Sequence, residues 1–188
     1  QENLDIKEAI VEDLIIEKSK IAERTKLIEQ RLAALRNSKA SSEVQKVSDN
    51  RHRMEQVTTF RGVCFIDDSK SENINSTYFS LEQVQNKIVW LIVGEDSTTD
   101  YSQLLPMVVG KVKAVVCMGE NRKEIMSVFS GHVPVILECG DMETAVRQSF
   151  YAAQKNDVVL LSTACRAGRV YENYFQRGNS FKKAIAQL

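Results

Sequence analysis

The chain has 188 residues, of which 43% are apolar and 27% are charged. This composition excludes a fibre or a largely disordered chain, and the length allows one full domain plus an appendage. The 25 basic and 25 acidic side chains cancel, so the protein as a whole has no field that would attract nucleic acid or an anionic membrane surface. We therefore expect no nucleic-acid partner.

The apolar runs do not predict a membrane span. The longest of them, such as "KIVWLIVG" and "DVVLLS", have the length of strands and fall short of the roughly 20 residues that a membrane helix needs. No charged and apolar leader opens the chain, and its four cysteines form no C-x-x-C pair. We expect a cytoplasmic protein with reduced cysteines and no metal site, although a leader already removed would leave the same sequence.

Residues 1–36 predict a long helix. Neither glycine nor proline occurs between residues 4 and 36, and apolar side chains recur every seven residues. One position of this repeat holds Leu14, Ile21, Ile28 and Leu35. The position three residues earlier includes the polar Lys18 and Thr25. We predict a coiled coil that forms a homodimer or binds a partner protein, with a helical hairpin or packing onto the rest of the chain as alternatives.

The spacing of apolar residues changes after a polar, serine-rich stretch. Residues 37–50, "NSKASSEVQKVSDN", suit a linker or the turn of a helical hairpin. Residues 51–188 then alternate between short apolar runs and stretches with helical spacing. The runs predict strands at 53–60, 62–68, 87–94, 112–119, 133–138 and 157–162. The stretches between them predict helices at 73–84, 101–110, 121–129, 142–154 and 170–187.

This alternation predicts an α/β domain with a Rossmann-like, mostly parallel sheet and helices on both faces. Ligands of such sheets bind at the carboxyl ends of the strands. The functional loops are therefore expected directly after the strands, in "DDSKSEN", "GEDSTTD", "MGENR", "ECGD" and "STACRAGR". Neither a G-x-x-x-x-G-K-[ST] loop nor a G-x-G-x-x-G loop occurs in the sequence, so we expect no cofactor on these residues alone.

The segments "HRMEQV", "DDSKSENINST", "GEDSTTDYSQLLP", "DVVLLSTAC" and "ENYFQRGNSFK" occur in an order and spacing that resemble the C-terminal domain of the Mur ligases, most closely the D-glutamate-adding MurD branch. The resemblance covers residues 51–188. It implies nucleotide contacts at Arg53 and Asp68, and an amino-acid-binding loop that includes Lys70 and Asn73. It also implies that ATP and magnesium would be held by a different domain of a complete ligase.

This chain departs from the family pattern where the amino acid would bind. Glu72 replaces a threonine of the loop after the second strand, and Ser97 stands where the family has a lysine. In "STACRAGR", Ala167 replaces a ligand-binding serine, and Tyr174 further on replaces a phenylalanine. D-Glutamate carries two carboxylates, and a buried charge without a partner costs about 3 to 5 kcal/mol. We therefore expect these loops not to bind D-glutamate.

The charged substitutions suggest a contact across the former pocket. One carboxylate, Glu72, appears on one loop, and two guanidinium groups, Arg166 and Arg169, appear on the other. We predict a salt bridge between Glu72 and one of these arginines. The alternative is a retuned pocket in which Arg166 and Arg169 bind another anion.

Three functions are compatible with these patterns. We expect a non-catalytic module, displayed on a coiled coil, that acts as a scaffold or binding domain linked to peptidoglycan synthesis. The first alternative is a fragment of a divergent ATP-dependent ligase whose other domains lie outside these residues. The second is a nucleotide sensor that keeps Arg53 and Asp68 but turns nothing over.

Overall fold

The computed structural model describes residues 51–95 and 98–188. The chain divides into two units, Gln1–Asp49 and Asn50–Leu188, and the described residues belong to the second. The predicted coiled coil at 1–36 and the linker at 37–50 therefore lie outside the described residues.

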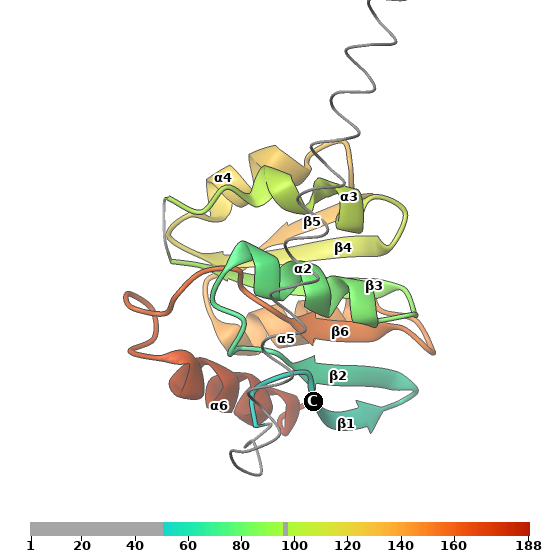
Figure 1. The fold of residues 1–188 in the computed structure, drawn as a ribbon. Helices are drawn as coiled ribbons and strands as arrows, with labels where there is room; N and C mark the ends of the chain where they lie inside the picture. The colour runs from blue at the N-terminus through green and yellow to red at the C-terminus, as the bar shows by residue number, and fades with distance from the viewer. Residues whose placement is uncertain (1–50, 96–97) are drawn as a thin grey trace, which may run out of the picture. The chain divides into compact units, whose positions relative to one another are not determined.

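The described residues form a six-stranded sheet, and all six predicted strands are confirmed. Its order across the sheet is β1-β2-β6-β3-β4-β5, as Figure 1 shows from bottom to top. β1 runs antiparallel to β2, and every other neighbouring pair is parallel. The strands are β1 (Glu55–Phe60), β2 (Val63–Asp67), β3 (Ile88–Gly94), β4 (Val112–Gly119), β5 (Val135–Glu138) and β6 (Val158–Leu161).

Strand β3 shows why both faces of this sheet are covered by other parts of the chain. All seven of its residues, "IVWLIVG", are buried. Successive side chains of a strand point to opposite faces. Leu91 accordingly packs into one apolar core and Trp90 into the other. A strand that is apolar at every position requires a layer on each face, which is the reason the continuous apolar run predicted a parallel sheet.

Helices supply those two layers (Figure 1). One face is covered by α2 (Ile74–Gln83), the 3₁₀ helix η1 (Tyr101–Leu104), α3 (Leu105–Val108) and α4 (Arg122–Phe129). The other face is covered by α5 (Met142–Ala152) and α6 (Tyr174–Ile185). The predicted Rossmann-like α/β architecture with helices on both faces is confirmed for the described part of the chain. Among these residues, no helix is both long and apolar enough to cross a membrane.

Two predicted helices differ from the observed ones. The helix expected at 101–110 is a 3₁₀ turn followed by a single short α-helical turn, because Pro106 supplies no N–H to the helical hydrogen-bond pattern. The helix expected from residue 170 begins only at Tyr174. Asn173 caps it by accepting a hydrogen bond from the Gln176 N–H. The backbone N–H groups just before Asn173 are engaged elsewhere, as described below.

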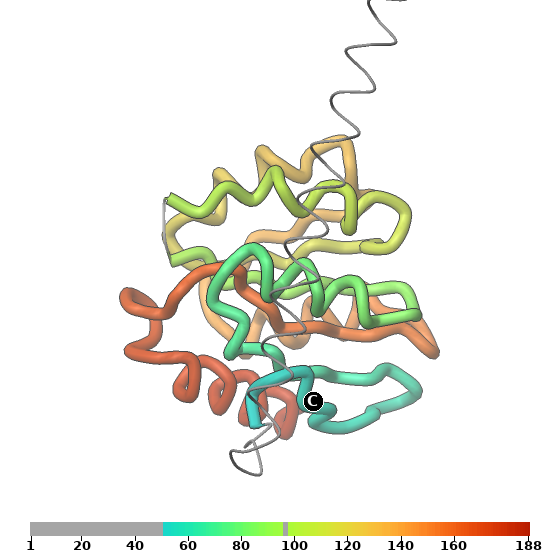
Figure 2. The backbone as a smooth tube through the Cα atoms, viewed as in Figure 1, coloured from blue at the N-terminus to red at the C-terminus, as the bar shows by residue number. Residues whose placement is uncertain are grey.

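The position of β6 determines which loops meet. Because β6 lies between β2 and β3, the loop that follows it lies between the loops that follow β2 and β3. All three loops are at the carboxyl ends of parallel strands, on the left of the view in Figure 2. Segments around residues 70, 95 and 168, far apart in the sequence, therefore meet at one edge of the sheet.

Candidate functional site

The two predicted nucleotide contacts differ in exposure. Arg53 is exposed, whereas Asp68 is fully buried. The Asp68 carboxylate accepts hydrogen bonds from the Met54 N–H at 3.1 Å and from the Ser162 hydroxyl at 2.8 Å. Burial raises the pKa of the Asp68 carboxyl above its ordinary value, although the hydrogen bonds that it accepts oppose the rise. Asp68 thus joins the loop after β2 to the end of β6, and a nucleotide role for it stays a prediction.

The other residues of the loop after β2 stabilise the first turns of two helices. Asn73 caps α2, because its Oδ1 accepts a hydrogen bond from the Ser76 N–H at 2.9 Å. The Lys70 ammonium lies 5.7 Å from the centre of the Tyr174 ring. Tyr174 is the first residue of α6, and its ring stacks on Phe175 at a centroid distance of 4.4 Å. This loop and the first turn of α6 are therefore in direct contact.

Glu72 and Arg169 have different partners from the predicted ones. Glu72 Oε1 accepts a hydrogen bond from the Ala167 N–H at 3.3 Å and lies 3.8 Å from Arg177 Nη2. Arg169 pairs with Glu120 at the surface. The physical reason is burial: Arg177 is completely buried and needs a countercharge, while 62% of the Arg169 side chain is exposed to solvent.

Glu95, which directly follows β3, is the site residue that the sequence reasoning missed. Its side chain is almost completely buried. Its Oε2 accepts hydrogen bonds from the backbone N–H groups of Gly168, Arg169 and Val170 at 2.8, 2.8 and 3.0 Å. The Tyr171 N–H follows at 3.5 Å. The available signal was the position of an acidic residue at the carboxyl end of a buried strand, in "GEDSTTD".

Arg177 connects Glu95 to Glu72. Its Nη1 donates a hydrogen bond to Glu95 Oε1 at 3.4 Å, and its Nη2 donates one to the Ser69 carbonyl at 2.9 Å. We call Glu72, Glu95, Arg177 and the backbone of residues 167–171 the Arg177 cluster. The complete burial of Arg177 and these contacts indicate a residue that holds the fold together.

A hollow of about 390 Å³ opens beside the Arg177 cluster. Its wall includes Glu72, Asp100 and Arg166, so it carries two acidic side chains and one basic side chain. Ala167, the next residue after Arg166 in the chain, is half-buried and carries a methyl group where the family pattern has a hydroxyl. Ser97, the remaining predicted site residue, lies outside the described residues. The walls of this hollow can hold a cationic or neutral group more readily than a dicarboxylate.

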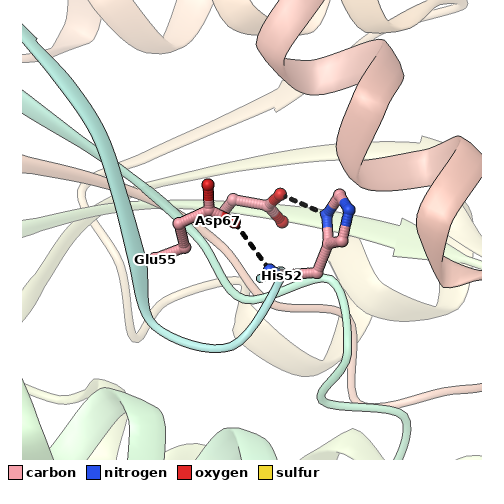
Figure 3. Close-up of side chains that lie close together, drawn as sticks. All are labelled: His52, Glu55 and Asp67. Atoms are coloured by element: carbon pink, nitrogen blue, oxygen red, sulfur yellow. Dashed lines mark hydrogen bonds and ion pairs between the residues drawn. The ribbon is translucent and has the colours of Figure 1, made fainter. Parts of the chain in front are cut away.

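A second buried group of charges lies between β1, β2 and α6 (Figure 3). His52 Nδ1 lies 2.7 Å from Asp67 Oδ2, and Glu55 Oε2 accepts a hydrogen bond from the His52 N–H at 2.7 Å. These three side chains have the residue types of a metal site. The Lys182 ammonium, however, lies 2.7 Å from Glu55 Oε2 and 3.5 Å from Asp67 Oδ2, where it supplies the cation. We call these four residues the Lys182 cluster.

The four cysteines are free thiols, as the sequence predicted. Cys117 lies in β4 and Cys139 directly follows β5, and the two belong to opposite apolar cores. Burial, assisted by the nearby Glu138 carboxylate, raises the pKa of the Cys117 thiol to about 12. A thiol with such a pKa stays protonated and unreactive at neutral pH.

Comparison with known proteins agrees with this fold and with the loop sequences. The sequence model of the family described as "Mur ligase, glutamate ligase domain" matches residues 52–165, which is more than half of the chain. The chain belongs to the Mur ligase family. Several curated relatives of this Mur ligase domain carry the name UDP-N-acetylmuramoylalanine–D-glutamate ligase. The relative from Christiangramia forsetii is 39% identical over 137 residues, and that from Salinibacter ruber is also 39% identical over 137 residues.

The match covers most of this chain but a minor part of each relative. It spans 73% of this chain, 31% of the Christiangramia forsetii ligase and 30% of the Salinibacter ruber ligase. The chain thus spans about a third of the length of the curated relatives it matches.

Solved structures show the same fold at low sequence identity. The folylpolyglutamate synthase from Thermotoga maritima aligns with a TM-score of 0.52 and 11% identity, over 76% of this chain and 32% of that one. The UDP-N-acetylmuramate-alanine ligase from the same organism aligns with a TM-score of 0.51 and 12% identity, over 72% of this chain and 30% of that one. The α/β fold of the Mur ligase domain is therefore shared with both.

Proposed function

We propose that this Mur ligase domain is a non-catalytic binding or scaffolding module that works in peptidoglycan synthesis. The observation that carries the proposal is the position of the Glu72 carboxylate. It lies in the wall of the hollow beside the loop of residues 164–166, and it contacts both the Ala167 N–H and Arg177. A carboxylate of the chain itself thus engages these two donors and leaves them less available to the carboxylate of an external amino acid.

The charges of the hollow support this proposal. The relatives are named for a ligase that takes D-glutamate, which brings two negative charges. Next to Glu72 and Asp100 these charges would be repelled, and Arg166 is the basic side chain in the same wall. A buried charge without a partner costs about 4 kcal/mol of binding free energy, which weakens binding roughly a thousandfold. The described residues therefore favour a partner other than D-glutamate.

The predicted coiled coil at 1–36 gives the module a way to assemble. Seven-residue spacing of apolar side chains is typical of helices that pair with another helix. A homodimer would present two Mur ligase domains side by side on one stalk, and a heterologous helix would connect one domain to a partner protein. Either arrangement uses the domain as a binding surface and requires no ATP or magnesium on this chain.

A ligase fragment is the second candidate function. It is supported by 39% identity over one run of 137 residues and by the small share of each relative that the chain covers. In this case the ATP, the magnesium and the phosphate loop would come from domains outside the given residues. The Mur ligase domain would then have to accept an amino acid despite Glu72.

Titration with D-glutamate separates the two candidates. We expect the native chain to show no saturable heat and no rise in melting temperature up to millimolar D-glutamate. The matched variant is Glu72→Thr, which restores the family residue and removes the repelling charge; we expect it to bind at least tenfold better than the native chain. Saturable binding of D-glutamate by the native chain, unchanged in Glu72→Thr, would favour the ligase fragment.

Light scattering tests the assembly. The full chain and a chain reduced to residues 51–188, which belong to one compact unit, are measured at the same concentration. We expect a dimer for the full chain and a monomer for the shorter one. A monomer in both cases would mean that residues 1–36 do not pair with a second copy, and the partner-protein form of the proposal would remain.

A further inference from the structure

The backbone of residues 168–171 presents a row of N–H groups to a single point. Four successive amides are directed at Glu95 Oε2, at distances from 2.8 to 3.5 Å. Consecutive backbone N–H groups that converge in this way form an anion-binding concavity. Such bonds to a charged oxygen are about twice as strong as those between neutral groups.

A buried cation completes this concavity. Arg177 is fully buried, and its Nη1 donates a hydrogen bond to the other oxygen of Glu95 at 3.4 Å. Its Nε is buried and has no hydrogen-bond partner among the described residues. The site thus offers N–H donors to one carboxylate oxygen and a guanidinium group to the other, an arrangement that favours a carboxylate over a spherical anion such as chloride.

The occupant of the site comes from another segment of the chain. Glu95 is 73 residues or more away in sequence from each of the amides that it accepts hydrogen bonds from. It enters from the end of β3, while the amides belong to the connection between β6 and α6. The N–H donors and the carboxylate that they bind therefore belong to different segments of the chain, as the groups of a binding site and its ligand belong to different molecules.

We infer that residues 168–171 and Arg177 form a carboxylate-binding site and that Glu95 is its resident internal ligand. An external carboxylate binds there when the Glu95 carboxylate is removed. Gly168, Arg169 and Val170 belong to an exposed connection, so in the Glu95→Ala variant a small carboxylate would enter from this side. This inference concerns a different carboxylate from Glu72, and it holds whether or not the domain is catalytic.

The test is rescue of the Glu95→Ala variant by acetate. The substitution removes two carbon and two oxygen atoms, and acetate has the same four heavy atoms and the same charge. We expect the variant to melt at a lower temperature than the native chain, and acetate to raise that temperature saturably. At a tenfold excess of acetate over its dissociation constant, the rise should be about 3 to 5 °C.

Two controls make the result specific. Pivalate has the same charge as acetate but is too bulky for the vacated space, and it should give no rise. The Glu120→Ala variant removes an exposed carboxylate that pairs with Arg169 of the same loop, and acetate should not shift its melting temperature. An equal acetate shift in the native chain, in Glu120→Ala and in Glu95→Ala would overturn the inference, and so would the lack of any shift in Glu95→Ala.

Hydrogen exchange on the native chain decides the question if Glu95→Ala does not fold. The amides of residues 168–170 lie in an exposed connection and would ordinarily exchange fast. If they bind the Glu95 carboxylate, they should exchange at least tenfold more slowly than the amide of an exposed residue in the same connection, such as Arg166. Exchange at equal rates would overturn the inference without any variant.

Discussion

Helix α6 contributes to two groups of buried charges that differ in their access to water. In the Arg177 cluster, the side chains of Arg177 and Glu95 are 0% and 1% exposed. In the Lys182 cluster, the ammonium and the Glu55 carboxylate are 25% and 30% exposed. The two pairs lie about one helical turn apart on the same helix, yet Arg177 and Glu95 are shielded from water while Lys182 and Glu55 stay in contact with solvent. Each cluster also has a member of the other kind, because the Glu72 side chain is 31% exposed and that of Asp67 is 0% exposed.

The difference follows from what each cluster does. A guanidinium group has five donors in a rigid fork, so one buried arginine can connect several loops at once. Arg177 uses this geometry to hold the loop after β2, the end of β3 and the connection to α6 together. Lys182 is a flexible point charge, and it joins only β1 and β2 to the last turns of α6. The buried Arg177–Glu95 pair therefore lies at the candidate site, and the more exposed Lys182–Glu55 pair secures the edge of the sheet.

The largest effect is expected from Arg177→Met. The substitution leaves Glu95 buried without its guanidinium partner, and we expect it to lower the free energy of unfolding by about 3 to 5 kcal/mol in urea titration. Arg169→Met is the matched control, because its exposed pair with Glu120 should contribute at most about 1 kcal/mol. Equal losses in the two variants would contradict the contrast between sealed and open charges.

Arg177→Lys refines this result. Lysine keeps the positive charge but lacks the forked set of N–H donors of the guanidinium group. We therefore expect its free energy of unfolding to lie between those of the native chain and Arg177→Met. If Arg177→Lys loses as much stability as Arg177→Met in urea titration, the geometry of the guanidinium group matters as much as its charge.

Gly178→Ala tests the space between the two clusters. A Cβ atom at this position would lie 2.2 Å from His52 Nδ1 and 2.6 Å from Asp67 Oδ2. We expect a loss of about 1 to 3 kcal/mol in urea titration from overpacking, even though alanine favours helix formation over glycine by about 1 kcal/mol. Gly140→Ala is the control, since a Cβ atom there meets nothing within 4 Å. A stabilised Gly178→Ala variant would show that His52 can move aside at little cost.

Lys182→Met probes the Lys182 cluster. Burial alone would raise the pKa of Glu55, but the hydrogen bonds from Lys182 and from the His52 N–H outweigh it and hold that pKa below its ordinary value. Because the pKa is lowered in the folded state, this stabilisation is present above the ordinary glutamate pKa and is lost as the pH falls through the lowered value. We expect Lys182→Met to lower the free energy of unfolding by about 1 kcal/mol at pH 7.

The pH dependence separates this ion pair from a packing effect. The difference between the native chain and Lys182→Met should shrink as the pH falls below the ordinary glutamate pKa and through the lowered value, where Glu55 becomes protonated. Lys183→Met, at the exposed neighbouring position, is the control and should change stability little at any pH. A Lys182→Met difference that stays constant down to pH 3 would assign the loss to packing of the lysine side chain.

The smallest expected effect is the salt dependence of the stability losses in Lys182→Met and Arg177→Met. The Debye length falls from about 10 Å at 0.1 M to about 3 Å at 1 M salt, and exposed pairs are screened far more than buried ones. The effect of Lys182→Met should therefore fall by a few tenths of a kcal/mol in 1 M sodium chloride, while that of Arg177→Met stays the same. Urea titration at the two salt concentrations measures both. An equal decrease in both variants would mean that water reaches Glu95 and Arg177.

Several parts of the site could be predicted from local sequence. Asn73, Asp141 and Asn173 cap helices, and each is a short polar residue directly before a helical stretch. The loop that holds Glu72 was expected to be functional because it follows an apolar strand. Glu95 could not be singled out, because its partners are backbone amides that any residue type would offer. The partner of Glu72 was placed on Arg166 or Arg169 instead of Arg177, because the burial of an arginine is not visible in sequence.

The sequence by itself determined the elements of this domain and the two-layered covering of its sheet. Alternating periods of two and 3.6 residues encode strands and helices locally, and a strand that is apolar throughout requires cover on both faces. Only the tertiary structure decided that β6 inserts between β2 and β3 and that Glu95 meets the amides of residues 168–171. Strand order depends on long-range packing of similar apolar faces, and the local spacing of apolar residues in the sequence does not determine it.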